Sequence, residues 1–286
     1  MGVQIMEKKV SVIGSGLMGS GIAQVFAYSG FNTVLIDIKE SFVENALSKI
    51  EKQLERMVEK NKCSNDEKNA VLSRIKISTN YDDAKDSELV VEAVNENIEI
   101  KKDVFRKLDS ICNKETILAS NTSTLSIASL ASVTNRADKV IGMHFFIPAP
   151  VMKLVEIIPS INTSLETLNF IKDVSDKLNK VSVTAKDFPG FIVNRIFVPM
   201  WNEAMFLVME GIDPKDIDNA MKYGANLPMG PLELADFAGL DTVLSVMNTL
   251  YDGFKDSKFR PCPLLVKKVE SGNLGRKTGK GFYDYK

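Results

Sequence analysis

The sequence predicts an α/β fold: an N-terminal sheet of parallel strands with helices, followed by a domain of helices alone. Up to about residue 185, short β-branched runs alternate with helical patterns, whereas only helical patterns follow. The change falls at the segment K-D-F-P-G (186–190), where Pro and Gly interrupt regular structure. We therefore expect two domains, residues 1–185 and 186–286.

Seven short runs in the first part have the composition of strands. Several are almost wholly apolar, as expected for strands buried on both faces of a parallel sheet. The runs are Val10–Gly14, Thr33–Asp37, Leu89–Val94, Ile117–Ser120, Val140–Phe145, Lys153–Ile158 and Val181–Thr184. Alternation of such strands with helices predicts right-handed crossover units.

A long helix is expected from about residue 40 to residue 60. Apolar residues recur along it at spacings of three and four, which predicts one buried stripe. The stripe consists of Phe42, Ala46, Ile50, Leu54 and Met57.

The second part of the chain is expected to form four helices. Three of them begin at a Pro, which is pre-organised for the first turn of a helix. The expected helices are Phe191–Met209, Pro214–Tyr223, Pro231–Tyr251 and Pro263–Ser271.

Composition excludes several classes of protein. The chain has 36 Lys and Arg against 37 Asp and Glu, so it lacks the basic surplus of a nucleic-acid binder. No apolar run approaches the roughly 18–20 residues that span a bilayer, and Met1–Val12 lacks a signal-peptide pattern. We expect neither a nucleic-acid nor a membrane partner.

Cysteine and histidine usage limits the chemistry. The three cysteines are widely spaced, with neither metal-ligand spacing nor a disulfide framework, which favours a reducing cytoplasm. His144 is the single histidine, so zinc sites that need two histidines are excluded. We expect no metal cofactor.

The first strand leads into a glycine fingerprint, G-S-G-L-M-G (14–19), and then into a helix. Gly14 permits the tight turn, Gly16 lets a pyrophosphate approach the backbone, and Gly19 lets helix and strand pack closely. N–H groups at the helix start, around Leu17 and Met18, face the phosphates.

Asp37 ends the second strand about 20 residues after Gly16, where a carboxylate binds the adenosine ribose. The fingerprint and this acid together predict a dinucleotide cofactor. The carboxylate would repel a 2′-phosphate and so favours NAD(H), although Lys39 nearby leaves NADP(H) open.

His144 lies at the end of an apolar strand, where ligands bind in such sheets. A hydride transfer to a ketone needs a proton donor that titrates near neutrality, and imidazole meets this need. If the next strand pairs with this one, the carboxylate of Glu156 can fix the tautomer of the imidazole. The alternatives are a structural histidine and a surface glutamate.

Several motifs along the whole chain resemble those of the L-3-hydroxyacyl-CoA dehydrogenase family, and most closely its short bacterial members acting on 3-hydroxybutyryl-CoA. The motifs are V-I-G-S-G-L-M-G-S-G-I-A-Q (12–24), A-S-N-T-S-T-L-S-I (119–127), G-M-H-F-F (142–146), P-A-P-V-M-K-L-V-E (148–156), D-F-P-G-F-I-V-N-R (187–195), G-P-L-E-L-A-D (230–236) and G-R-K-T-G-K-G-F-Y (275–283). The resemblance implies a Rossmann-type NAD-binding domain, a helical domain, and a substrate such as acetoacetyl-CoA or 3-hydroxybutyryl-CoA between them. It also implies a homodimer through the helical domain.

The resemblance also implies roles for individual residues. His144 resembles the acid/base, Glu156 its partner, and Ser123 and Asn194 the groups that bind the 3-oxygen of the substrate. Residues matching the nicotinamide end and other parts of the cofactor site are Asn121, Glu96, Lys101 and Lys277.

The long helix carries a basic stripe at spacings of three, four and four: Lys49, Lys52, Arg56 and Lys60. A solvated face is the simplest interpretation. The resemblance places the phosphates of coenzyme A here, with Arg56 and Lys60 as the matching positions.

One position departs from the family pattern, because Ile147 stands where H-F-F-N-P would place a cofactor-binding asparagine. Three alternatives to the family activity remain: a dehydrogenase of another hydroxy acid of the sugar-acid type, a non-catalytic cofactor-binding protein, and a detached piece of a multifunctional β-oxidation enzyme. The intact pair His144–Glu156 and the basic residues Arg56 and Lys60 argue against the first two.

Overall fold

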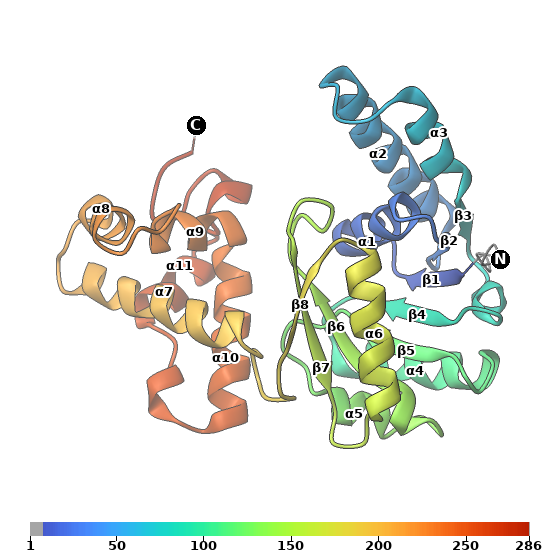
Figure 1. Ribbon diagram of the computed structural model, residues 1–286. Helices are drawn as coiled ribbons and strands as arrows, with labels where there is room; N and C mark the ends of the chain where they lie inside the picture. The colour runs from blue at the N-terminus through green and yellow to red at the C-terminus, as the bar shows by residue number, and fades with distance from the viewer. Residues whose placement is uncertain (1–7, 286) are drawn as a thin grey trace. The chain divides into compact units, whose positions relative to one another are not determined.

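The computed structural model describes residues 8–285. Contacts divide the chain into two compact units, Met1–Asp187 and Phe188–Lys286. The first unit is a sheet with helices and the second is helical (Figure 1). The expected α/β class, with a helical domain after the sheet domain, is therefore confirmed.

The sheet has eight strands in the order β3-β2-β1-β4-β5-β6-β7-β8. The strands are β1 (Lys9–Ile13), β2 (Asn32–Ile36), β3 (Ile75–Ser78), β4 (Leu89–Glu92), β5 (Ile117–Ser120), β6 (Val140–Phe145), β7 (Leu154–Pro159) and β8 (Val181–Thr184). The sequence did not predict β3, because this four-residue edge strand has only one fully buried residue and no apolar run.

The expectation of a wholly parallel sheet is wrong at one pair of strands. The strands from β3 to β6 are parallel, but β7 runs antiparallel to β6 and parallel to β8. Residues 146–153 join β6 to β7 without a helix, whereas a parallel crossover needs about a dozen residues or more.

Helices lie on both faces of the sheet (Figure 1). They are α1 (Leu17–Tyr28), α2 (Glu40–Glu59), α3 (Asn65–Ser73), α4 (Ile98–Ile111), α5 (Ile127–Ala131) and α6 (Leu165–Lys177), with short 3₁₀ turns at Tyr81–Ala84 and Ala137–Lys139. A capping box at Ser64 and Glu67 starts α3, which lies beside α2 at the β3 end of the sheet (Figure 1).

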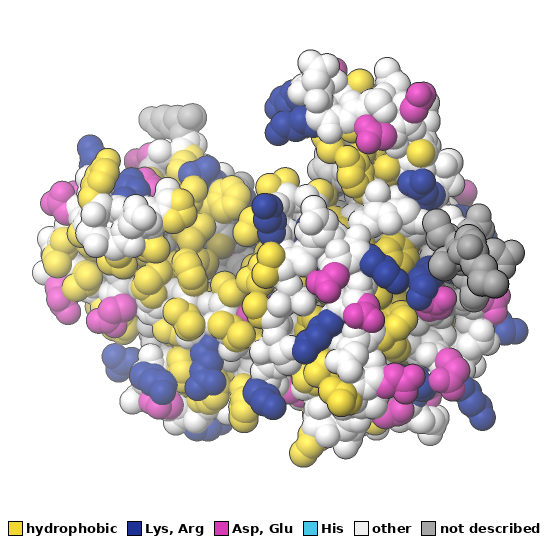
Figure 2. Space-filling view, viewed as in Figure 1, with side chains coloured by type: hydrophobic (Ala, Val, Ile, Leu, Met, Phe, Trp, Pro, Cys, Tyr) yellow, Lys and Arg dark blue, Asp and Glu magenta, His cyan; other side chains and the backbone are white. Residues whose placement is uncertain are grey.

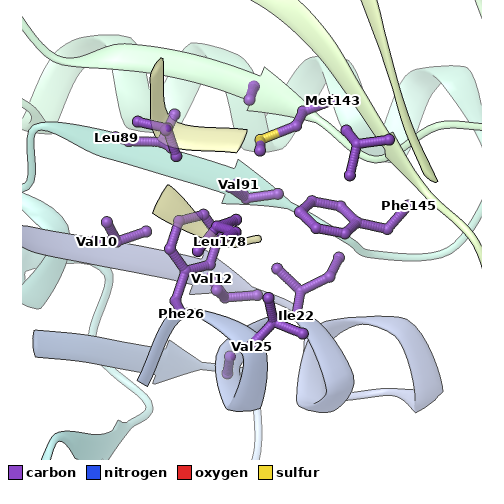
Figure 3. Close-up of a cluster of buried hydrophobic side chains, with 14 of the residues drawn as sticks. Val10, Val12, Ile22, Val25, Phe26, Leu89, Val91, Met143, Phe145 and Leu178 are labelled. Atoms are coloured by element: carbon purple, nitrogen blue, oxygen red, sulfur yellow. The ribbon is translucent and has the colours of Figure 1, made fainter. Parts of the chain in front are cut away.

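A core of buried side chains lies between the sheet and α1 (Figure 3). The strands contribute every second residue, as the alternation of side chains along a strand requires. The labelled residues come from β1 (Val10, Val12), β4 (Leu89, Val91), β6 (Met143, Phe145), α1 (Ile22, Val25, Phe26) and the end of α6 (Leu178).

The buried stripe of α2 differs from the expected one at its start. Val43, not Phe42, is buried with Ala46, Ile50 and Leu54, and Phe42 is exposed beneath the Lys39 ammonium at 5.3 Å from its ring. Residues four apart do not lie exactly above one another, because an α-helix has 3.6 residues per turn. A step of three residues, from Ala46 back to Val43, therefore keeps the first buried residue on the same face as the others.

The second unit contains α7 (Val193–Met209), α8 (Pro214–Gly224), α9 (Pro231–Ala238), α10 (Leu240–Phe254) and α11 (Pro263–Glu270), with 3₁₀ turns at Ser257–Phe259 and Arg276–Thr278. The single helix expected over 231–251 is wrong. Gly239 has φ +94°, a backbone conformation that breaks the helix into α9 and α10.

The C-terminal segment of the second unit is held by a buried carboxylate. Asp236 accepts hydrogen bonds from the backbone N–H groups of Phe282 and Tyr283 and from the Tyr285 hydroxyl, each at 3.0 Å. Burial, together with Asp236, raises the pKa of Tyr285 to about 12. Within the described part of the chain, no helix combines the length and apolar character needed to cross a bilayer.

Candidate active site

The glycine fingerprint forms a tight turn between β1 and α1. Gly14 has φ +98°, and a methyl group added there would lie 2.6 Å from the Ala93 carbonyl oxygen. A methyl group at Gly19 would lie 1.8 Å from the Gly14 oxygen, whereas one at Gly16 would meet no atom within 4 Å. Gly14 and Gly19 thus serve packing, and Gly16 leaves the backbone open to a phosphate.

Asp37 follows β2 and its carboxylate reaches back to the glycine turn. One oxygen accepts hydrogen bonds from the backbone N–H and the hydroxyl of Ser15, at 2.6 and 2.7 Å, and the other accepts from Ile38 N–H at 2.7 Å. The sequence did not single out Ser15. These bonds aim the carboxylate beside the turn, so the residues present fit a dinucleotide with its ribose at Asp37.

His144 and Glu156 face each other across the antiparallel strands β6 and β7. The Nδ1 atom of His144 lies 2.8 Å from a carboxylate oxygen of Glu156, and both side chains are buried. The Phe146 ring packs on the imidazole with ring centroids 4.6 Å apart. A buried carboxylate at this distance fixes the tautomer and the orientation of the imidazole.

Glu96 holds the turn that follows β5. One of its oxygens accepts from the Thr122 hydroxyl at 2.6 Å, and from the N–H and hydroxyl of Ser123 at 2.8 and 3.1 Å. Its other oxygen pairs with Lys101 at 3.2 Å. Burial acts to raise the pKa of Glu96, but the Lys101 charge and these donors outweigh it and hold the pKa below its usual range.

Lys101 is buried, with 1% of its side chain exposed. Its ammonium lies 2.7 Å from Glu92, which also accepts from the Ser120 hydroxyl and the Val94 N–H, each at 2.6 Å. Burial raises the pKa of Glu92 although these partners oppose it. Sequence reasoning missed Glu92, whose signal is a charged residue inside an otherwise apolar strand.

The carboxyl ends of β1, β2, β4, β5 and β6 share one edge of the sheet, because these strands are parallel. This edge brings together the glycine turn, Asp37, Glu96, Ser123 and His144. Asn121 links two of the strands, since its side-chain oxygen accepts from Phe145 N–H at 2.9 Å. Ile147 follows this point and is 52% exposed.

The remaining predicted residues lie farther along the chain. Arg56 is in the last turn of α2 and Lys60 caps it, and both are exposed, as are Lys49 and Lys52. Asn194 lies in the first turn of α7, and the Lys277 ammonium pairs with Asp241 at 2.5 Å. Asn194 and Lys277 belong to the second unit.

No group of three or more His, Cys, Asp or Glu side chains within residues 8–285 is arranged to hold a metal ion.

Comparisons with known proteins cover nearly the whole chain. Residues 9–188 match the family model described as 3-hydroxyacyl-CoA dehydrogenase, NAD binding domain, and residues 190–285 match the C-terminal domain of the same family. The chain is 50% identical over 278 residues to 3-hydroxybutyryl-CoA dehydrogenase of Clostridioides difficile, covering 97% of this chain and 99% of that protein. It is 44% identical over 291 residues to mitochondrial hydroxyacyl-coenzyme A dehydrogenase of Homo sapiens, covering 99% and 93%.

A solved structure has the same fold throughout. The crystal structure of (S)-3-hydroxybutyryl-CoA dehydrogenase from Ralstonia eutropha superposes with a TM-score of 0.95 at 46% identity, covering 98% of this chain and 99% of that one.

Asp37→Asn tests the ribose carboxylate. The amide keeps the size of the side chain but loses the charge, so NADH should bind more weakly by roughly 10–100-fold, since a bond to a charged group nets about 1.5–3 kcal/mol. NADPH should lose less, because the repulsion of its 2′-phosphate disappears. Titration of both cofactors measures the ratio of the two affinities. Asp66→Asn, on the exposed first turn of α3, is the control, and an unchanged ratio in Asp37→Asn would contradict the assignment.

Proposed function

The chain belongs to the 3-hydroxyacyl-CoA dehydrogenase family, and we propose that it catalyses reversible hydride transfer between NAD(H) and C3 of a short-chain 3-hydroxyacyl-CoA. We take acetoacetyl-CoA and 3-hydroxybutyryl-CoA as the substrate pair, in keeping with the names of the relatives. The observation that carries most weight is the buried pair His144–Glu156, 2.8 Å apart at the sheet edge that also holds the glycine turn.

Bound NADH supplies the hydride that adds to the carbonyl carbon of the substrate. As the electrons of the C=O double bond move onto the oxygen, His144 donates the proton that this oxygen requires. In the reverse direction the neutral imidazole accepts the proton of the 3-hydroxyl group. Glu156 holds the ring in one tautomer and stabilises the imidazolium, as a buried carboxylate does for a histidine that shuttles protons.

Ser123 is proposed to donate a hydrogen bond to the 3-oxygen of the substrate. Such a neutral donor polarises a carbonyl group without adding charge. Support comes from Glu96, which binds both the backbone and the hydroxyl of Ser123 and so fixes its turn. Asn194 is a second proposed donor, on sequence match alone.

Cofactor binding is proposed at Gly14, Gly16, Leu17, Met18, Gly19 and Asp37, with Asn121, Glu96 and Lys101 toward the nicotinamide end and its ribose. Lys277 is proposed as a C-terminal lysine that reaches the cofactor. Lys101 forms ion pairs with Glu92 and Glu96. We therefore propose that Lys101 acts by orienting the Glu96 side chain. NADP(H) is a poorer cofactor in this proposal, and the proposed chemistry needs no metal.

Arg56 and Lys60 are proposed to bind the phosphates of coenzyme A. Both are exposed at the outer end of α2, and Figure 2 shows Lys and Arg side chains gathered at the outer end of the α2–α3 pair.

A homodimer through the helical unit is also proposed. Figure 2 shows hydrophobic side chains gathered over this unit. Its exposed large apolar residues include Ile196, Met209, Ile212, Tyr223 and Phe237. We place the dimer in the cytoplasm, since Cys63, Cys112 and Cys262 are free thiols, as a reducing compartment keeps them.

The function is tested by following NADH absorbance with acetoacetyl-CoA, and in parallel with free acetoacetate and with NADPH. We expect turnover with NADH and the thioester, and far less with the other two combinations. Equal turnover of free acetoacetate would favour a dehydrogenase of free hydroxy acids.

His144→Gln should lower kcat by about 10²–10⁴-fold, because it removes the proton donor and keeps polar bulk. Stopped-flow or steady-state assays give kcat, and a thermal melt checks that the variant is folded. A loss below tenfold in a folded variant would exclude His144 as the acid/base.

Lys60→Glu should raise the KM for acetoacetyl-CoA and leave kcat nearly unchanged, because it places a negative charge beside the nucleotide phosphates. A truncated thioester that lacks the nucleotide should be affected much less. Lys49→Glu is the matched control, about 16 Å along the same helix by its rise per residue. Equal effects on both thioesters would mean that the stripe is only a solvated face.

Ile147→Asn should tighten NADH binding by a few-fold, since a restored hydrogen bond nets about 0.5–1.5 kcal/mol. Ile147 is 52% exposed, so the new amide keeps contact with water and the melting temperature should not fall. Val151→Asn, a more exposed position in the same loop, is the control. Weaker NADH binding together with a lower melting temperature would show that the neighbours have repacked around isoleucine.

A further inference from the structure

Lys180 is a buried lysine that no step above uses. It lies directly before β8 and is 9% exposed. Its ammonium donates hydrogen bonds to the backbone oxygens of Ala149 and Met152, each at 2.7 Å. Burial lowers the pKa of Lys180. Burial removes the Lys180 ammonium from water, and hydrogen bonds to two carbonyl groups of one loop offset this cost.

The two carbonyls belong to the loop 146–153, which joins the strands of His144 and Glu156. The loop is compact, because the N–H groups of Val151 and Met152 both donate to the Pro148 oxygen, at 2.9 and 3.0 Å. It begins at Phe146, whose ring packs on the imidazole. A shift of the loop would therefore act on the surroundings of His144.

The loop also lies on α1, the helix that begins at the glycine turn. A methyl group at Gly21 would lie 3.2 Å from Ala149 Cβ and 3.3 Å from Pro150 Cδ. The absence of a side chain at Gly21 thus lets the loop approach the cofactor helix closely. The loop therefore contacts both α1 and Lys180.

Apolar burial does little to hold this loop. Ala149 is its buried residue, whereas Ile147, Val151 and Met152 are 52%, 71% and 40% exposed. The anchor itself is firm, because Lys180 N–H donates to Ser175 O at 3.0 Å and Val181 N–H donates to Lys153 O at 2.8 Å. Charged hydrogen bonds from a fixed point can hold in place a loop that packing leaves loose.

We propose that Lys180 is a positioning residue that clamps the loop 146–153, which also contacts α1, and so sets where the nicotinamide cofactor binds relative to His144. This role rests on the proposed function for its chemistry. The clamp acts on cofactor binding, because the loop touches the cofactor helix and carries Ile147 at its exposed start.

The test is Lys180→Met, which keeps an unbranched side chain one atom shorter and removes the ammonium. We expect the Kd and KM for NADH to rise about tenfold, as for a binding loop that has lost its pre-organisation. The KM for acetoacetyl-CoA should change by less than about twofold on the same argument. Amide hydrogen exchange of residues 147–153 should become faster.

Two further variants separate positioning from general stability. Lys177→Met removes the same charge from an exposed position at the end of α6 and should match the unmodified protein. Lys180→Arg keeps a charged donor and should recover NADH binding relative to Lys180→Met. If Lys180 were only structural, Lys180→Met would reduce the fraction of folded protein and thus the apparent kcat. The folded molecules would then bind NADH as tightly as the unmodified protein, and this result would overturn the proposal.

If Lys180→Met does not accumulate as folded protein, Gly21→Ala is the second variant, because its methyl group would press on Ala149 at 3.2 Å and on Pro150 at 3.3 Å. It should produce the same selective loss of NADH affinity. If it does not, the clamp is refuted. NADH titration and hydrogen exchange need no turnover, so they test the role of Lys180 independently of activity. Failure of the unmodified protein to reduce acetoacetyl-CoA would refute the proposed function alone.

Discussion

The antiparallel pairing of β6 with β7 is the interaction on which the candidate active site depends. Its register sets His144 opposite Glu156, and a slip of one residue would turn one of the two side chains to the other face of the sheet. Glu156 has no exposed surface, and a buried carboxylate is stable only when it is paired and hydrogen-bonded. The contact between His144 and Glu156 therefore stabilises the register of β6 and β7, and this register in turn brings the two side chains together.

Buried charge organises the rest of this edge in a similar way. Glu92, Lys101 and Glu96 form a chain of ion pairs from the end of β4 to the turn after β5, where Glu96 binds Ser123. Asp37 is likewise tied to Ser15 in the glycine turn. Polar groups held in this manner are oriented before a ligand arrives, which is the condition for electrostatic stabilisation of a reacting carbonyl group.

The features that sequence reasoning missed have several physical causes. The strand β3 is an edge strand without an apolar run, and the helix expected over 231–251 breaks at Gly239 because of a backbone angle that composition does not reveal. In the sequence, Glu92 and Lys180 look like ordinary exposed charged residues. Their burial depends on the residues that pack around them, which the sequence alone does not show. Phe42 fits the periodic stripe, yet Val43 takes the buried place because the stripe drifts around the helix.

By itself the sequence determined the α/β class, the glycine turn with Asp37 after the second strand, and His144 as the single histidine, because these follow from local spacing and composition. Tertiary structure decided that β7 turns back against β6, that Glu156 meets His144 at 2.8 Å, and that Lys101 and Lys180 are buried. The physical reason is that strand direction and burial depend on contacts between residues far apart in the chain. Local propensity carries no information about such contacts.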